Sequence, residues 1–248
     1  MGRAAPALPL GRTDGRTHSD LLELREGLCR HARRAAASLM AMKLYSFQGA
    51  PNPRRVLIFA EEKGLALDVV EVNLRGGETK TPAFLGKNPS GKIPVLELED
   101  GTCLPESVAI CRYLEALAPE PNLFGRDPLE TAQIEAVHRQ LELELFAHIG
   151  AAWVNGPIVA AAGLVKPIEA QRLRGEGLAK KYYARLNEEL SSRPFLAGER
   201  FTIADISAVC LVEFAGARVN LAPDASLTAL AAWHERVRSR PSVQAHPA

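Results

Sequence analysis

Two prolines within three residues, Pro119 and Pro121, divide this chain of 248 residues into parts with different hydrophobic patterns. A helix cannot continue through both, because each lacks a backbone N–H and clashes with the preceding turn. Short alternating runs precede the break, whereas helical spacings follow it. We therefore predict a linker at residues 119–125, between an α/β domain at residues 42–118 and an all-helical domain at residues 126–248.

The α/β part combines strand-like runs with short helices. The first strand, the helix after it and the second strand form a β-α-β unit, whose two strands should be parallel. A Glu-Asp-Gly turn at residues 99–101 joins the last two strands as a hairpin. The predicted elements are strands at residues 43–47, 67–72, 94–98 and 102–104 and helices at 53–63, 82–85 and 106–117.

The part after the linker has helical spacing throughout. Asp127-Pro128 is typical of an N-cap followed by proline at the first helical position. Further helices are predicted at residues 167–190, 203–217 and 226–238. The apolar residues that the helix starting at Asp127-Pro128 should bury are Ile134, Val137, Leu141 and Leu145.

The first 41 residues differ in composition, with seven Arg, no Lys and four acidic residues. They lack the long apolar core of a secretion signal. Residues 21–39 could form a basic amphipathic helix of a transit peptide. The favoured interpretation is an extension outside the fold, upstream of an initiator at Met40 or Met42. The whole chain has a net charge of +1, so we expect no nucleic-acid or membrane partner. We also expect a cytoplasmic location.

Removal of residues 1–41 should leave the stability of the protein unchanged, because they lack the apolar periodicity needed to join a packed core. Thermal unfolding of the full chain and of a chain that starts at Met42 checks this. A melting temperature several degrees lower for the shortened chain would show that the extension docks.

The most informative run is residues 88–114, N-P-S-G-K-I-P-V-L-E-L-E-D-G-T-C-L-P-E-S-V-A-I-C-R-Y-L. Ile93-Pro94 places a proline at the start of a strand, where the missing N–H costs least. In isolation this pair would be an ordinary feature of an edge strand.

Glu106 and Ser107 follow at the start of an amphipathic helix. Ser107 is a natural N-cap, and the end of that helix offers free N–H groups and a positive dipole to a carboxylate. Glu106 supplies a negative charge for an adjacent ammonium. A site for both groups suits the γ-glutamyl end of glutathione, whereas a simple capped helix explains Ser107 alone.

These motifs together strongly resemble the glutathione-binding site of the glutathione transferase family, over about residues 42–240. The opening M-K-L-Y-S-F…P-R-R-V-L-I-F-A-E-E-K-G resembles the family's first strand and helix. The resemblance implies a thioredoxin-like first domain in which Pro94 is cis, glutathione as co-substrate without a metal, and a homodimer. The residues that it implies for glutathione binding are Lys92, Ile93, Pro94, Glu106 and Ser107.

The run F-T-I-A-D-I-S-A at residues 201–208 resembles a capping motif of the family's helical domain. Thr202 would cap a helix, and Asp205 would reach back to the N–H of the cap. We assign this motif a role in folding.

The residues that would activate the glutathione sulfur depart from the family pattern. Only the thiolate is a competent nucleophile, so the protein must stabilise the anion with a donor near the first helix. Ala50 occupies the position of the usual catalytic Ser or Cys and cannot donate. Asn52 is the nearest donor, as in bacterial Nu-class members, which are associated with disulfide reduction. Asn52-Pro53 also fits an N-cap, and Ser46 is the second candidate.

Three functions can be weighed against these patterns, and two of them remain. The leading one is an enzyme of detoxification that uses glutathione on a small electrophile or a disulfide. The second is a non-catalytic glutathione-binding or regulatory module, which Ala50 keeps open. A thioredoxin-type oxidoreductase is excluded, because the four cysteines form no C-x-x-C pair.

The second substrate cannot be named from the sequence. Its pocket should lie along the long helix after the linker, which carries an apolar stripe of Phe146, Ile149 and Trp153. Such stripes are more often core than pocket.

Overall fold

A computed structural model describes residues 42–163 and 165–248. The interpretation of residues 1–41 as an extension lies outside the described residues. Four strands form one sheet in the order β2-β1-β3-β4, in which β1 and β2 are parallel and the other pairs antiparallel. The strands are β1 (Lys43–Ser46), β2 (Asp68–Glu71), β3 (Val95–Glu97) and β4 (Cys103–Pro105). The predicted β-α-β unit and hairpin are confirmed, with strand ends within one residue of the prediction.

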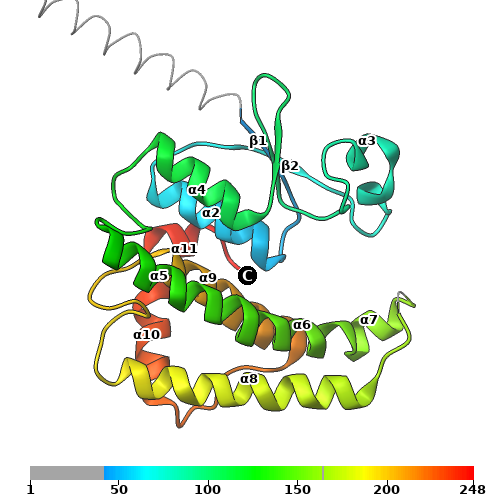
Figure 1. Cartoon of the computed structure of the whole chain (residues 1–248). Coiled ribbons are helices and arrows are strands. Elements are labelled where there is room, and N and C mark those ends of the chain that lie inside the picture. The colour runs from blue at the N-terminus through cyan, green and yellow to red at the C-terminus, as the bar shows by residue number, and fades with distance from the viewer. Residues whose placement is uncertain (1–41, 164) are drawn as a thin grey trace, which may run out of the picture. The chain divides into compact units, whose positions relative to one another are not determined.

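The two faces of the sheet pack against different helices, because side chains alternate along a strand. Leu44 and Leu96 join the large core beneath α2 and α4, whereas Val95 joins a small cluster with Phe84 of α3. Figure 1 shows α2 and α4 side by side, with α3 away from both. The helices of this half are α2 (Pro51–Glu62), η1 (Glu78–Lys80), α3 (Pro82–Leu85) and α4 (Ser107–Leu117).

Helix α2 begins two residues earlier than the sequence predicts. Ala50 is its cap residue and Pro51 takes the first helical position, so Asn52 is the second helical residue. The interpretation of Asn52 as an N-cap is therefore wrong. The physical reason is that a helix tolerates proline throughout its first turn, where no N–H is required, so Pro53 does not have to mark the first position.

Helix α4 also starts differently. Glu106 is its cap residue, with a φ of 69°, and Ser107 is the first helical residue. The prediction that Ser107 caps the helix is wrong. Its hydroxyl is buried and accepts a hydrogen bond from Arg55 of α2, and no side chain of the described residues caps the helix.

The second half of the chain is helical, as predicted. Helix α5, the π-helical stretch η2 and α6 follow one another without a break, and η3 continues α9. Helices α7 and α11 were not predicted, because five residues are too few to show a helical period. The elements are α5 (Pro128–Gln140), η2 (Leu141–Phe146), α6 (Ala147–Val154), α7 (Pro157–Ala161), α8 (Glu169–Leu190), α9 (Ile203–Phe214), η3 (Ala215–Val219), α10 (Thr228–Arg238) and α11 (Pro241–Ala245).

Helices α6 and α8 pack closely because of one glycine. A Cβ at Gly175 would lie 2.6 Å from the carbonyl oxygen of His148, so no larger residue fits there without a shift. None of the helices in the two described ranges is both long and apolar enough to cross a membrane.

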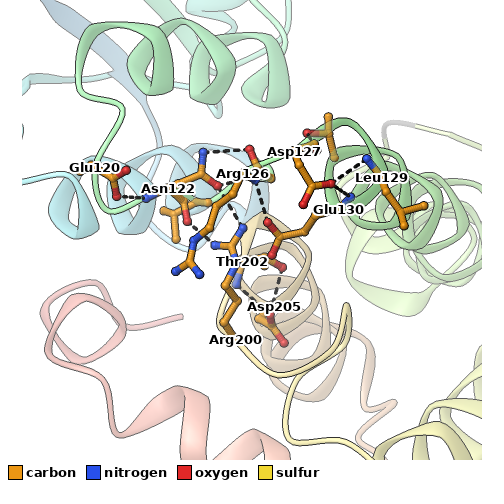
Figure 2. A network of polar contacts seen from close by, with 12 residues as sticks. Glu120, Asn122, Arg126, Asp127, Leu129, Glu130, Arg200, Thr202 and Asp205 are labelled. Atoms are coloured by element: carbon orange, nitrogen blue, oxygen red, sulfur yellow. Dashed lines mark hydrogen bonds and ion pairs between the residues drawn. The ribbon is translucent and has the colours of Figure 1, made fainter. Parts of the chain in front are cut away.

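Arg200 joins the linker to the start of α5 (Figure 2). Its Nε donates to Glu130, and its Nη2 donates to Asn122 Oδ1 at 3.0 Å. The hydrogen bond from Arg200 lowers the pKa of Glu130 to about 2. Asp127 caps α5 as predicted, and its Oδ1 accepts the N–H of Leu129 at 2.8 Å.

Asp205 fixes the start of α9. Its Oδ2 accepts the N–H of Thr202 at 3.0 Å, which confirms the predicted reach back to the cap. Its Oδ1 accepts the N–H of Leu196 at 3.0 Å and Nε1–H of Trp233 at 2.9 Å. The side chain is fully buried, so it organises the helical core.

Helix α2 is held to the helices of the second half by ion pairs. Arg54 Nη2 lies 2.6 Å from Glu213 Oε2 of α9, and both side chains are largely buried. Arg240 donates two hydrogen bonds to Glu62, at 2.8 and 2.7 Å. These contacts place the end of α9 near the start of α2, where the candidate site lies.

Candidate active site

Candidate residues from three strands lie at one edge of the sheet, the edge where β1 and β4 end and β3 begins. Val95 of β3 pairs with Tyr45 of β1 on one side and with Pro105 of β4 on the other. Directly beyond these paired residues lie Ser46, Pro94 and Glu106. Because the register is continuous, residues far apart in the sequence become neighbours at this edge.

The Ile93–Pro94 peptide bond is cis, as the family resemblance implies. Pro94 is buried, and the N–H and C=O of Ile93 have no hydrogen-bond partner in residues 42–163 and 165–248. Lys92 is exposed, and its carbonyl accepts a hydrogen bond from Asn88 Nδ2 at 2.8 Å, which fixes the loop. The edge therefore offers a free backbone N–H and C=O at Ile93 to a peptide-like ligand.

The start of α4 offers a site for an anion next to a negative side chain. The N–H groups of Ser107, Val108 and Ala109 have no partner among the described residues, as expected for a helix N-terminus. Glu106 is exposed and has a positive φ, which is uncommon for a residue other than glycine and clusters at functional sites. A carboxylate and an ammonium group can both be bound here.

Arg55 is a candidate functional residue that the sequence analysis missed. Its Nη1 donates to Ser107 Oγ at 2.6 Å, and both side chains are buried. Its Nε and Nη2 have no partner in the described parts of the chain, and burial lowers the pKa of the guanidinium. This cation lies behind the start of α4, so it adds positive potential where a carboxylate would bind. The only signal in the sequence was the pair of arginines after Pro53.

The start of α2 has few backbone donors. Pro51 and Pro53 have no N–H, and the N–H of Arg54 donates to the Ala50 carbonyl at 3.3 Å. The free donors in this turn are therefore the backbone N–H and the side-chain amide of Asn52. Asn52 Oδ1 is buried without a hydrogen-bond partner among the described residues.

A cleft of about 770 Å³ opens beside this turn. Asn52 and Ser46 are not among its lining residues. Ser46 is buried and lines a smaller hollow with Arg54 and His246 instead. We call the larger space the cleft. It is lined by Phe47, Gln48, Gly49, Ala50, Pro51, Glu71, Leu74, Arg75, Trp153, Ile158, Val159, Ala162, Phe214, Arg218 and Ala248.

The predicted apolar stripe divides between core and cleft. Ile149 is fully buried, and Phe146 packs partly buried against the same core. Trp153 lines the cleft, where its ring meets that of Phe214 at 5.3 Å between centroids. Only the last residue of the stripe therefore faces the space where a second substrate could bind.

The cysteines of the described chain are not activated nucleophiles. Burial raises the pKa of the Cys111 and Cys210 thiols, and partial burial raises that of Cys103. A thiolate in this site must therefore come from a bound ligand.

Comparisons with known proteins match both halves of the chain to one family. Residues 50–117 match the model of the glutathione S-transferase N-terminal domain, and residues 158–241 match that of the C-terminal domain. Glutathione S-transferase 2 of Saccharomyces cerevisiae is 37% identical over 210 residues, which cover 82% of this chain and 88% of the relative.

Two further matches extend the comparison. A crystal structure of a glutathione S-transferase domain-containing protein from Marinobacter aquaeolei is similar with a TM-score of 0.75 and 36% identity, over 81% of this chain and 99% of that one. A probable elongation factor 1-gamma of Arabidopsis thaliana is 37% identical over 171 residues, which cover 69% of this chain but 40% of the relative. From its two matched domains and its identity to the yeast transferase, this chain belongs to the glutathione S-transferase family of enzymes.

Proposed function

We propose that this protein binds glutathione at the sheet edge around Ile93, Pro94 and Glu106 and uses its thiolate on a second substrate. The observation that carries the proposal is the combination of the free backbone N–H and C=O of Ile93 with the unpartnered N–H groups of α4. A peptide can pair with the backbone segment, and its γ-glutamyl carboxylate can bind at the helix start. Glu106 would bind the ammonium group, and Lys92 would lie beside the bound peptide.

Asn52 is the proposed donor to the glutathione sulfur. Ala50 has no hydroxyl, and the prolines on both sides of Asn52 leave its N–H and its side-chain amide as the donors of this turn. Asn52 lies directly after Pro51, the last residue of this segment in the lining of the cleft. The dipole of α2 also favours an anion at this end. Ser46 stays the second candidate, from the end of β1.

Replacing Asn52 by Ala should raise the pKa of the bound glutathione thiol and lower the rate at neutral pH about tenfold, as expected for losing one donor to an anion. The stability should change by no more than about 0.5 kcal/mol, because Asn52 is not the cap and its buried oxygen has no partner. Absorbance of the thiolate against pH and steady-state rates measure both effects.

Three variants separate the possible donors. Asn52→Ala keeps the backbone N–H, so an unchanged thiolate titration would exclude the side chain. If Ser46→Ala alone abolished turnover, the sulfur would be held from β1 and the proposal for Asn52 would fail. Asn52→Ser restores a short donor and should recover part of the rate.

The reaction is tested with a panel of second substrates. We expect turnover of small electrophiles by conjugation, of disulfides by glutathione-dependent reduction, or of both. Glutathione affinity measured on the same preparation shows whether the site is occupied in each assay. Tight binding of glutathione without turnover of any substrate would contradict the enzymatic proposal.

A non-catalytic binding module is the second candidate function. Ala50 favours it, because the position lacks the usual catalytic hydroxyl or thiol. The similarity to an elongation factor 1-gamma, a protein named for another role, points the same way. Binding with no turnover would be the result that this alternative predicts.

The proposal also includes a homodimer, a cytoplasmic location and a role in detoxification. The support for all three is membership of the glutathione S-transferase family. Sedimentation of the purified protein measures its assembly directly.

A further inference from the structure

Two arginines line the cleft without any role described so far. Arg75 follows β2 and Arg218 lies in η3. Within residues 42–163 and 165–248, neither guanidinium forms an ion pair or a hydrogen bond. Arginine binds carboxylates through two parallel hydrogen bonds, so each is free to bind an anionic ligand.

Arg218 lies directly against the turn that leads into α2. A Cβ placed on Gly49 would lie 2.7 Å from Arg218 Nη2, and Gly49 has a φ of +83°. The absence of a side chain at Gly49 therefore lets the guanidinium reach the loop next to Ala50. This places a fixed positive charge beside the turn where the sulfur is proposed to bind.

The other walls of the cleft are mostly apolar. Trp153 and Phe214 form an aromatic pair, with Ile158 among the remaining lining residues. The one acidic side chain of the lining, Glu71, accepts the N–H of Gln48 at 3.0 Å. An apolar molecule that carries one carboxylate matches such a surface better than a neutral or cationic molecule.

We propose that the second substrate is a small aromatic or apolar electrophile with a carboxylate group, and that Arg218 binds this carboxylate. The inference rests on the proposed function, because it assumes glutathione in the neighbouring site. Arg218 thus sets specificity at the second-substrate site and takes no part in the chemical step.

The test compares a chlorodinitrobenzoate, with chlorine para to the carboxylate, with its methyl ester. The glutathione sulfur forms a bond to the carbon that carries chlorine, chloride leaves with the electrons of the C–Cl bond, and the thiol proton goes to solvent. The two compounds share size and leaving group, so the main difference is the negative charge. Each enzymatic rate is divided by the rate with glutathione alone, which removes the difference in intrinsic reactivity.

After this correction, we expect the protein to prefer the acid over the ester. Arg218→Gln should lower kcat/KM for the acid about tenfold, while the value for the ester stays within about twofold and KM for glutathione is unchanged. Arg218→Lys should recover part of the loss, because it keeps the charge but not the paired hydrogen bonds. Arg174→Gln removes the same charge from an exposed position of α8 outside the cleft, and should change neither substrate.

Four results would overturn the inference. An equal loss on both substrates would mean that Arg218 shapes the site without binding the carboxylate. A higher KM for glutathione with no change in selectivity would assign the guanidinium to glutathione. Conjugation of the ester but not of the acid would reject the substrate class and leave the proposed function standing, whereas no binding of glutathione in a calorimetric titration would reject both.

Discussion

Replacing Asp205 by Ala should destabilise the protein by about 3–5 kcal/mol, the largest effect that we expect from a single change. The carboxylate is fully buried and accepts hydrogen bonds from the backbone of Leu196 and Thr202 and from Trp233 Nε1. Alanine leaves all three buried donors without a partner, which costs more than the loss of the hydrogen bonds themselves. Urea unfolding followed by circular dichroism measures the difference.

Asp127 supplies a matched control for this prediction. It also accepts two backbone N–H groups at a helix start, but it is exposed to solvent. Asp127→Ala should therefore cost only about 1 kcal/mol, because water replaces the lost acceptor. If the two substitutions destabilised the protein equally, burial of Asp205 would not have the importance that we assign to it.

Replacing Glu106 should weaken glutathione binding at least about tenfold, equivalent to roughly 1.5–3 kcal/mol for the loss of a charge-assisted hydrogen bond. Glu106→Gln removes the charge and keeps the shape, and Glu106→Ala removes both. Calorimetric titration with glutathione measures the affinities of the two variants. Glu99→Gln, an exposed glutamate in the hairpin turn, controls for the general loss of a negative charge.

A modified ligand identifies the group that Glu106 binds. Glutathione without its amino group cannot form the proposed pair, so Glu106→Gln should weaken its binding little or not at all. If Glu106→Gln reduced the affinity for both ligands equally, the side chain would act through the shape of the loop. Unchanged affinity for glutathione in folded Glu106 variants would reject the assignment of this site.

The fold was predictable because its signals are local. Prolines at the linker and alternation in the short strands define the elements of the first half. The register that brings Pro94 and Glu106 to one edge follows from the hairpin, whose Glu-Asp-Gly turn at residues 99–101 is recognisable in the sequence. The same logic identified Asp205, since a capping motif spans only four residues.

The exact helix starts were not predictable, because more than one residue near each start suits the position. Pro51 and Pro53 can both lie in the first turn of α2, so the sequence alone did not assign Ala50 as the cap. At α4 the hydroxyl of Ser107 is engaged by Arg55, a tertiary contact between residues 52 positions apart.

The residues that line the cleft were also not predictable from the sequence. Arg218 reaches Gly49 across the fold, and only Trp153 of the predicted stripe contributes to the lining. Such pairings depend on how helices pack, which local patterns do not specify. The sequence therefore offered more residues for the proposed glutathione site than for the proposed second-substrate site.

The central claim is that glutathione binds here with its sulfur held as a thiolate at the start of α2. The most direct measurement is the ultraviolet absorbance of the thiolate in protein saturated with glutathione, followed against pH. Our account predicts an apparent pKa for the bound thiol clearly below the value of about 8.5 of a free cysteine thiol. A bound thiol that titrates at or above the free value, or no saturable binding of glutathione at all, would contradict it.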